Sequence, residues 1–131
     1  MKGEFYMWKN INGHLIPVTD DSRVKFRTTI SKNILEQLED LAEQHDTYIN
    51  YLLETGIQEV LQNEFIQYDK SLRPKDRVQY KTTYDNELLN QLKQFAADRK
   101  LFTNDVIEYA VNFINPDKAH KRDYRCRIEK L

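Results

Sequence analysis

Two stretches of the chain, residues 24–30 and 78–84, alternate between apolar and polar side chains. A period of two, together with β-branched and aromatic residues, predicts a β-strand in each stretch. The alternation buries Val24, Phe26 and Ile30 on one face of the first strand. It also turns the polar residues of both strands outward. These residues are Lys25, Arg27 and Thr29 in the first strand and Gln79, Lys81 and Thr83 in the second.

A helix N-cap residue follows each predicted strand, Ser31 in one case and Asp85 in the other. Apolar residues then recur at the spacing of one helix face, and after a polar break a second segment of the same kind begins. Thr47 and Thr103 are candidate N-caps for the second helices. The pattern therefore predicts the order strand, helix, helix twice in one chain.

The two units are copies of one sequence pattern. Residues 23–60 align with residues 77–114 at a constant shift of 54, without a gap over 38 positions, and ten of these positions are identical. Most other apolar positions exchange conservatively, such as Phe26 with Tyr80. Two unrelated helical segments would not keep register for so long, so the chain contains an internal repeat.

One repeat is too small to enclose a hydrophobic core, and its single strand leaves backbone hydrogen-bonding groups unpaired. Two repeats resolve both problems when their strands pair. The sequence therefore predicts a mainly α fold with a two-stranded antiparallel β-ribbon over four helices, and small β additions at the termini.

The strand-helix-helix order, the repeat size and the small residue in the second helix (Gly56 or Ala110) resemble the ribbon-helix-helix (MetJ/Arc) superfamily of DNA-binding proteins. The resemblance covers residues 23–60 and 77–114. Members usually form homodimers, and here it implies that both strands come from one chain through the connector Gln62–Asp76. We therefore expect a folded monomer with an internal pseudo-dimer, with further association on DNA left open.

The resemblance implies sequence-specific binding of double-stranded DNA by a transcriptional regulator, a repressor by family habit. A two-stranded ribbon fits the major groove, where Arg or Lys donates to guanine and Gln pairs with adenine. The outward residues of both strands match the superfamily's base-contacting positions, and because the two triplets differ, the half-sites should differ. The N-termini of the second helices favour phosphate oxygens, which makes Thr47, Tyr48, Thr103 and Asn104 candidate phosphate contacts.

The net charge of −1 gives no sign of nucleic-acid binding. The acids cluster elsewhere, however, notably on the solvent side of the first helix, and none lies within residues 23–30 or 77–84. Those two segments carry five Lys and Arg residues, so one basic face is compatible with the near-neutral total. Alternating Lys, Arg and Thr are also common on any exposed sheet face.

The segments outside the repeats carry weaker signals. Residues 1–22 predict a β-hairpin around Asn12-Gly13, a favoured tight turn. The extension 115–131 is basic, and its alternation from Asp123 favours another strand. Either segment could hold a protein partner. The tail could instead add phosphate contacts or remain a solvated basic terminus.

The composition predicts no enzyme and no cofactor or metal. The three His residues are scattered, the single Cys126 cannot complete a zinc-finger spacing, and no glycine-rich phosphate loop is present. One cysteine, no membrane-spanning run and no secretory signal predict a cytoplasmic protein.

The alternative function is a protein-interaction adaptor or antitoxin-like module with the same fold, or a regulator that does both. The predicted divisions are 1–22 (hairpin), 23–61 (first repeat), 62–76 (connector), 77–114 (second repeat) and 115–131 (extension).

Overall fold

The computed structural model describes residues 8–11, 14–17 and 22–124. Strands β1 (Trp8–Ile11) and β2 (His14–Pro17) pair antiparallel, within the segment for which the sequence predicts a hairpin. Other residues of the predicted hairpin segment 1–22, among them Phe5–Met7 and Val18, lie outside the described residues. Among the described residues, no helix has the length and apolar character required to cross a membrane.

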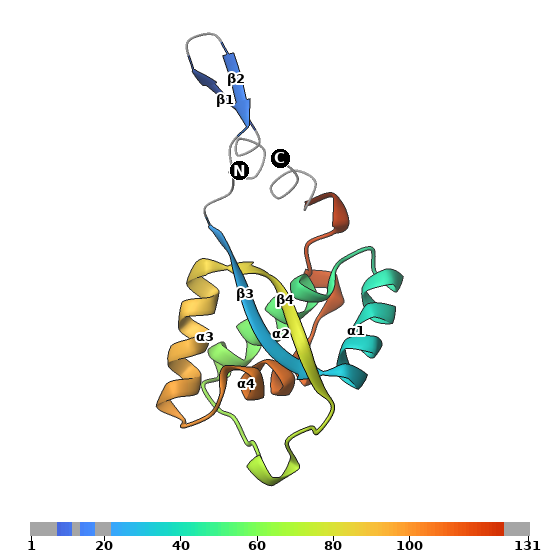
Figure 1. Ribbon diagram of the computed structural model, residues 1–131, viewed down its shortest axis with the longest axis vertical. Coiled ribbons are helices and arrows are strands. Elements are labelled where there is room, and N and C mark those ends of the chain that lie inside the picture. The colour runs from blue at the N-terminus through green and yellow to red at the C-terminus, as the bar shows by residue number, and fades with distance from the viewer. Residues whose placement is uncertain (1–7, 12–13, 18–21, 125–131) are drawn as a thin grey trace.

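The main body is mainly helical around a two-stranded antiparallel sheet, which confirms the predicted fold class at this level. Strand β3 (Arg23–Ser31) pairs with strand β4 (Arg77–Asp85). As Figure 1 shows, this ribbon crosses in front of helices α2 and α4, while α1 and α3 flank it on opposite sides. The helices are α1 (Lys32–Gln44), α2 (Ile49–Asn63), α3 (Asn86–Asp98) and α4 (Thr103–Ala110), with 3-10 turns η2 (Lys70–Leu72), η3 (Val111–Phe113) and η4 (Pro116–Lys118).

The register of the ribbon follows the internal repeat. Arg27 lies opposite Lys81, and the pairing continues symmetrically to Arg23 opposite Asp85 at one end and Ser31 opposite Arg77 at the other. Arg27 and Lys81 are themselves 54 positions apart, which is the shift of the sequence repeat. A two-fold rotation about the centre of the ribbon therefore brings each strand residue onto the position of its repeat equivalent on the other strand.

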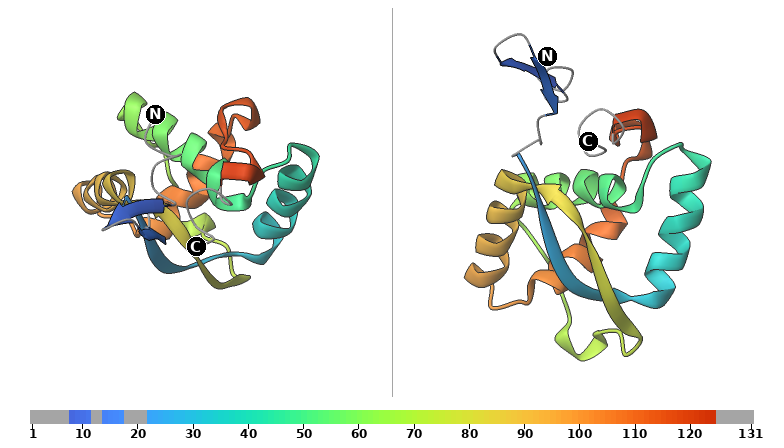
Figure 2. Two further views of the ribbon diagram at one scale, coloured as in Figure 1. Left: turned by 90° about the horizontal axis from the view of Figure 1, so that it is seen from above. Right: turned by 45° about the horizontal axis from the view of Figure 1, so that its top comes forward.

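The inner face of the ribbon closes one side of the core. Ile30 and Tyr84 are fully buried there, and Phe26 packs against Tyr84 with ring centroids 6.2 Å apart. The second helices supply much of the remaining core, because Leu53, Ile57 and Val106 are inaccessible to solvent. Figure 2 shows the helices gathered behind the ribbon, which leaves its other face open.

Helices α2 and α4 cross closely at Gly56, where the repeat equivalent is Ala110. A Cβ atom on Gly56 would fall well inside contact distance of the Ala110 carbonyl oxygen, and would also approach Ile114. Backbone cannot yield as a flexible side chain can, so the approach of the two helices depends on this glycine.

The predicted helix boundaries hold in part. Ser31 and Asp85 are the N-caps of α1 and α3, and their side chains accept hydrogen bonds from Ile34 N and Leu88 N. Thr47 and Thr103 were predicted to cap α2 and α4, and this prediction is wrong. The N-caps are Tyr48 and Phe102, which are repeat equivalents.

The second helix of the second repeat is shorter than its pattern predicts. Helix α4 ends at Ala110, and the chain continues as the 3-10 turn η3 instead of remaining α-helical to Ile114. At the C-terminal end, residues 122–124 form a helical turn, so no strand begins at Asp123. The rest of that predicted strand lies outside the described residues.

Gly56→Ala should lower the free energy of unfolding by about 1–3 kcal/mol, the usual cost of overpacking a core. This cost exceeds the gain of at most ~1 kcal/mol in helix propensity that the substitution brings. Urea denaturation followed by circular dichroism measures the change. Gln58→Ala, at an exposed position of the same helix, is the matched control and should leave stability nearly unchanged; equal stability of Gly56→Ala and wild type would show that the crossing tolerates a methyl group.

Candidate nucleic-acid interface

The open face of the ribbon carries the six predicted base-contacting residues. Lys25, Arg27, Gln79 and Lys81 are exposed, whereas Thr29 and Thr83 are half-buried. Alternation along two paired strands brings all six to one surface. The register arranges them in three cross-strand pairs, Lys25 with Thr83, Arg27 with Lys81, and Thr29 with Gln79.

The centre of this face juxtaposes two positive charges. Arg27 and Lys81 are direct cross-strand neighbours, and like charges in that position destabilise a sheet. Within residues 22–124, neither side chain has a hydrogen bond or an ion pair. The ribbon therefore presents uncompensated positive charge at its middle, which an anionic partner would neutralise.

Two other cations of these strands do not belong to the face. Arg23 forms a buried ion pair with Glu54, 3.0 Å apart, and Arg77 pairs with Glu108 and Asp105. All five Lys and Arg residues counted in the sequence lie in β3 and β4, but these two are neutralised by ion pairs. Three of the five, Lys25, Arg27 and Lys81, remain on the open face.

The two glutamates also hold the ends of the ribbon. Glu54 Oε2 accepts a hydrogen bond from Asp85 N at 2.8 Å, and Glu108 Oε2 accepts one from Ser31 N at the same distance. Burial raises the pKa of Glu54, although Arg23 opposes that shift. Because the same contact occurs in both repeats, both strand ends are tied to the second helices.

Asp105 gathers further contacts in the second repeat. Its side chain is inaccessible to solvent and accepts hydrogen bonds from Arg73, Arg77 and the Tyr68 hydroxyl. Burial by itself would raise the pKa of Asp105, but the hydrogen bonds from Arg73, Arg77 and their neighbours together hold it well below its ordinary value. These contacts fix the connector against α4 beside one end of the ribbon.

Asn50 and Asn104 support the outer edges of the two strands. Asn104 Nδ2 donates to Thr29 O at 3.1 Å and to Thr29 Oγ1 at 2.9 Å. Asn50 Nδ2 donates to Thr83 O at 2.8 Å. Asn104 was predicted to contact phosphate, whereas here its amide nitrogen supports the ribbon.

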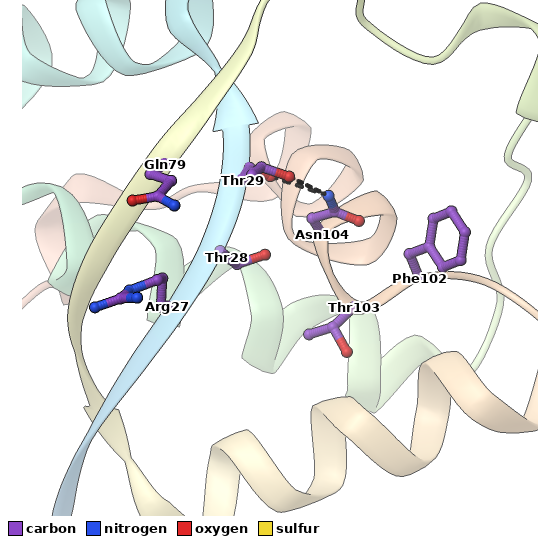
Figure 3. Close-up of a pocket in the computed structure, with 7 residues that line it drawn as sticks. All are labelled: Arg27, Thr28, Thr29, Gln79, Phe102, Thr103 and Asn104. Carbon is purple, nitrogen blue, oxygen red and sulfur yellow. Dashed lines mark hydrogen bonds between the residues drawn. The ribbon is translucent and has the colours of Figure 1, made fainter.

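A hollow of about 400 Å³ separates the ribbon from the start of α4. Figure 3 shows Arg27 and Gln79 over the strands, and Phe102, Thr103 and Asn104 across the hollow. The hollow thus brings predicted base-contacting residues next to two predicted phosphate-contacting ones. Phe102 is 60% exposed, and the guanidinium of Arg73 lies over its ring, 4.4 Å from the centroid.

The start of α2 is covered differently. Thr47 is fully buried, and its hydroxyl donates to His120 O. Arg122 donates to Thr47 O at 3.1 Å and lies over the Tyr48 ring, 5.4 Å from the centroid. The Thr47 hydroxyl is therefore directed into the protein. Arg122 of the C-terminal segment lies at the start of α2, whereas the equivalent start of α4 borders the hollow.

Sequence reasoning did not assign a supporting role to the polar residues that hold the ribbon in place. The identical pairs Arg23 and Arg77, Asn50 and Asn104, and Glu54 and Glu108 are polar positions kept in both repeats. The available signal was that these polar residues are identical in the two repeats although many neighbouring apolar residues differ. The role of each pair could not be inferred from this, because it depends on contacts between residues 31 or more positions apart.

Comparisons with known proteins add no assignment, since no family model, curated protein or solved structure matches this chain.

Asp105→Asn should flatten the acid side of the stability profile. A carboxyl whose pKa is lowered by folding stabilises the protein above its ordinary value of 3.8, and this contribution is lost as the pH falls below that value. We expect the difference in unfolding free energy between pH 5 and pH 2.5 to be smaller in the variant, as measured by urea denaturation at each pH. Asp40→Asn, on the exposed side of α1, serves as the control; a variant profile parallel to that of the wild type would contradict the assignment.

Proposed function

We propose that this protein is a sequence-specific double-stranded DNA-binding regulator, a tandem ribbon-helix-helix pseudo-dimer that inserts its β3–β4 ribbon into the major groove. The observation that carries the proposal is the open ribbon face with Arg27 and Lys81 paired at its centre. A two-stranded ribbon is one of the shapes that the major groove admits. Regulation of transcription, with repression as its sign, rests on the family resemblance.

The charge distribution supports a polyanionic partner. Lys25, Arg27 and Lys81 project from the same surface, and residues 23–30 and 77–84 contain no acidic residue. The one carboxylate of the two strands is Asp85, at the end of β4 opposite Arg23. Lysine and arginine donate to guanine O6 and N7, and Gln79 offers the donor and acceptor that adenine requires. The chemistry of the face therefore suits base edges as well as phosphates.

The flanks of the ribbon support the same proposal. Helix α4 begins beside the hollow, where Thr103 and its neighbouring backbone N–H groups lie near the ribbon edge. Helix N-termini favour phosphate oxygens because their N–H groups and dipole are positive. On the other flank, the guanidinium of Arg122 lies over Tyr48 at the start of α2. A phosphate there would contact this cation instead of the free N–H groups of a helix end.

The pseudo-dimer part of the proposal rests on paired contacts. The Glu54 contact to Asp85 N recurs as Glu108 to Ser31 N, and Asn50 recurs as Asn104. Lys32 N donates to Asp76 O, and its repeat equivalent Asn86 N donates to Ser22 O. Each member of a pair is displaced by 54 residues, as expected if the two repeats share an approximate two-fold axis through the ribbon.

Arg27→Ala and Lys81→Ala should each weaken specific DNA binding, by roughly 1–3 kcal/mol for each lost base contact. The measurement is a titration of full-length protein onto duplexes selected from genomic fragments, at two salt concentrations. Binding should also weaken as salt rises, because phosphate contacts release counterions. Lys70→Ala removes an exposed charge from the connector and serves as the matched control.

Unchanged affinity of both ribbon variants would show that the ribbon does not read DNA. If no fragment is retained even at low salt, the DNA-binding proposal fails, and the adaptor function becomes the better account of the fold.

Light scattering should show a well-folded monomer in the absence of DNA, because both strands of the β3–β4 ribbon and helices α1 to α4 come from one chain. The expected mass is that of one 15.8 kDa chain. An obligate dimer at low micromolar concentration would contradict the internal pseudo-dimer.

A further inference from the structure

We propose that the ribbon reads DNA with a fixed polarity, and that this polarity is set by one pair of equivalent residues, Lys25 and Gln79. The inference rests on the proposed function and adds to it the form of the recognised sequence. One half-site would be read through Lys25 and the other through Gln79.

The register isolates this pair. A two-fold rotation about the centre of the ribbon exchanges Arg27 with Lys81, Thr29 with Thr83, and Lys25 with Gln79. The first exchange keeps a cation and the second keeps the same residue. Only the third replaces a positive charge by a neutral amide, so it is the chemically unlike place on the face.

The two side chains select different bases. The lysine ammonium is a donor only, and it suits the two acceptors of guanine, N7 and O6. The glutamine amide has both a donor and an acceptor, which matches adenine N6 and N7. Both residues are exposed, so both can reach a base edge in the groove.

The surroundings of Lys25 and Gln79 also differ in charge. Gln79 borders the hollow at the start of α4, with Phe102 on its far side. Lys25 lies opposite Thr83, the residue supported by Asn50 from the start of α2. That end of α2 also carries Arg122 over Tyr48. The Gln79 end also has a cation, Arg73 over the Phe102 ring, but its guanidinium is ion-paired with Asp105. Among the described residues Arg122 has no such ion pair, so more of the positive charge at the Lys25 end is uncompensated.

The test compares the duplexes that four full-length proteins select from a random-sequence pool: wild type, Lys25→Gln, Gln79→Lys, and the double exchange. Wild type should select a non-palindromic sequence, with guanine preferred in one half and adenine at the equivalent place in the other. Gln79→Lys should select a palindrome with guanine in both halves, and Lys25→Gln a palindrome with adenine in both. Each single variant should bind its own palindrome about tenfold more tightly than the wild-type sequence.

The double exchange provides the internal control. It restores one lysine and one glutamine, so it should recover the mixed sequence, read from the opposite strand. A palindromic consensus from wild type, or an unchanged consensus from both single variants, would overturn the polarity while leaving DNA binding intact. Absence of enrichment with all four proteins would instead reject DNA binding itself, and the polarity with it.

Discussion

A ribbon of only two strands has no inner strand, so each strand exposes one edge of backbone donors and acceptors. Unpaired backbone groups of this kind are costly when shielded from water. The second helices meet this requirement through side chains, because Asn50 and Asn104 donate to strand carbonyls while Glu54 and Glu108 accept from strand N–H groups. The position of the open face follows from these four contacts.

The contacts also explain why cations are divided between inside and outside. A glutamate that accepts a backbone N–H in the core brings a buried charge, and a buried charge requires a partner. Arg23 and Arg77 fill that role. Lys25, Arg27 and Lys81 are not needed as partners of buried carboxylates, so they remain on the surface and give the ribbon face its positive charge.

The period-two and helical patterns were sufficient to predict both strands, the four helices and the outward direction of Lys25, Arg27 and Lys81. Local chemistry also identified the caps Ser31 and Asp85, whose side chains bond three residues ahead. The start of α2 could not be predicted in this way. Its cover comes from residues around His120, more than 70 positions away, so no local rule marks Thr47 as buried.

The same limit applies to the candidate site. Which polar residues face outward follows from alternation, but whether a cation is free depends on acids brought near by folding. Arg23 and Lys25 look alike in the strand sequence, and only the position of Glu54 distinguishes them. The hollow beside α4 likewise depends on how α4 approaches β3, which no spacing in the sequence encodes.

The close crossing of α2 and α4 has an evolutionary consequence. In a homodimer, one codon determines the residue at both sides of such a crossing, so a glycine needed on one side must be accepted on the other. Here the two sides carry Gly56 and Ala110. The loss of helix propensity, about 1 kcal/mol for a glycine, is incurred once, and the other side retains a good helix former. A chain that carries both copies of a repeat can place the glycine on one side of a crossing only, whereas a symmetric dimer must place it on both.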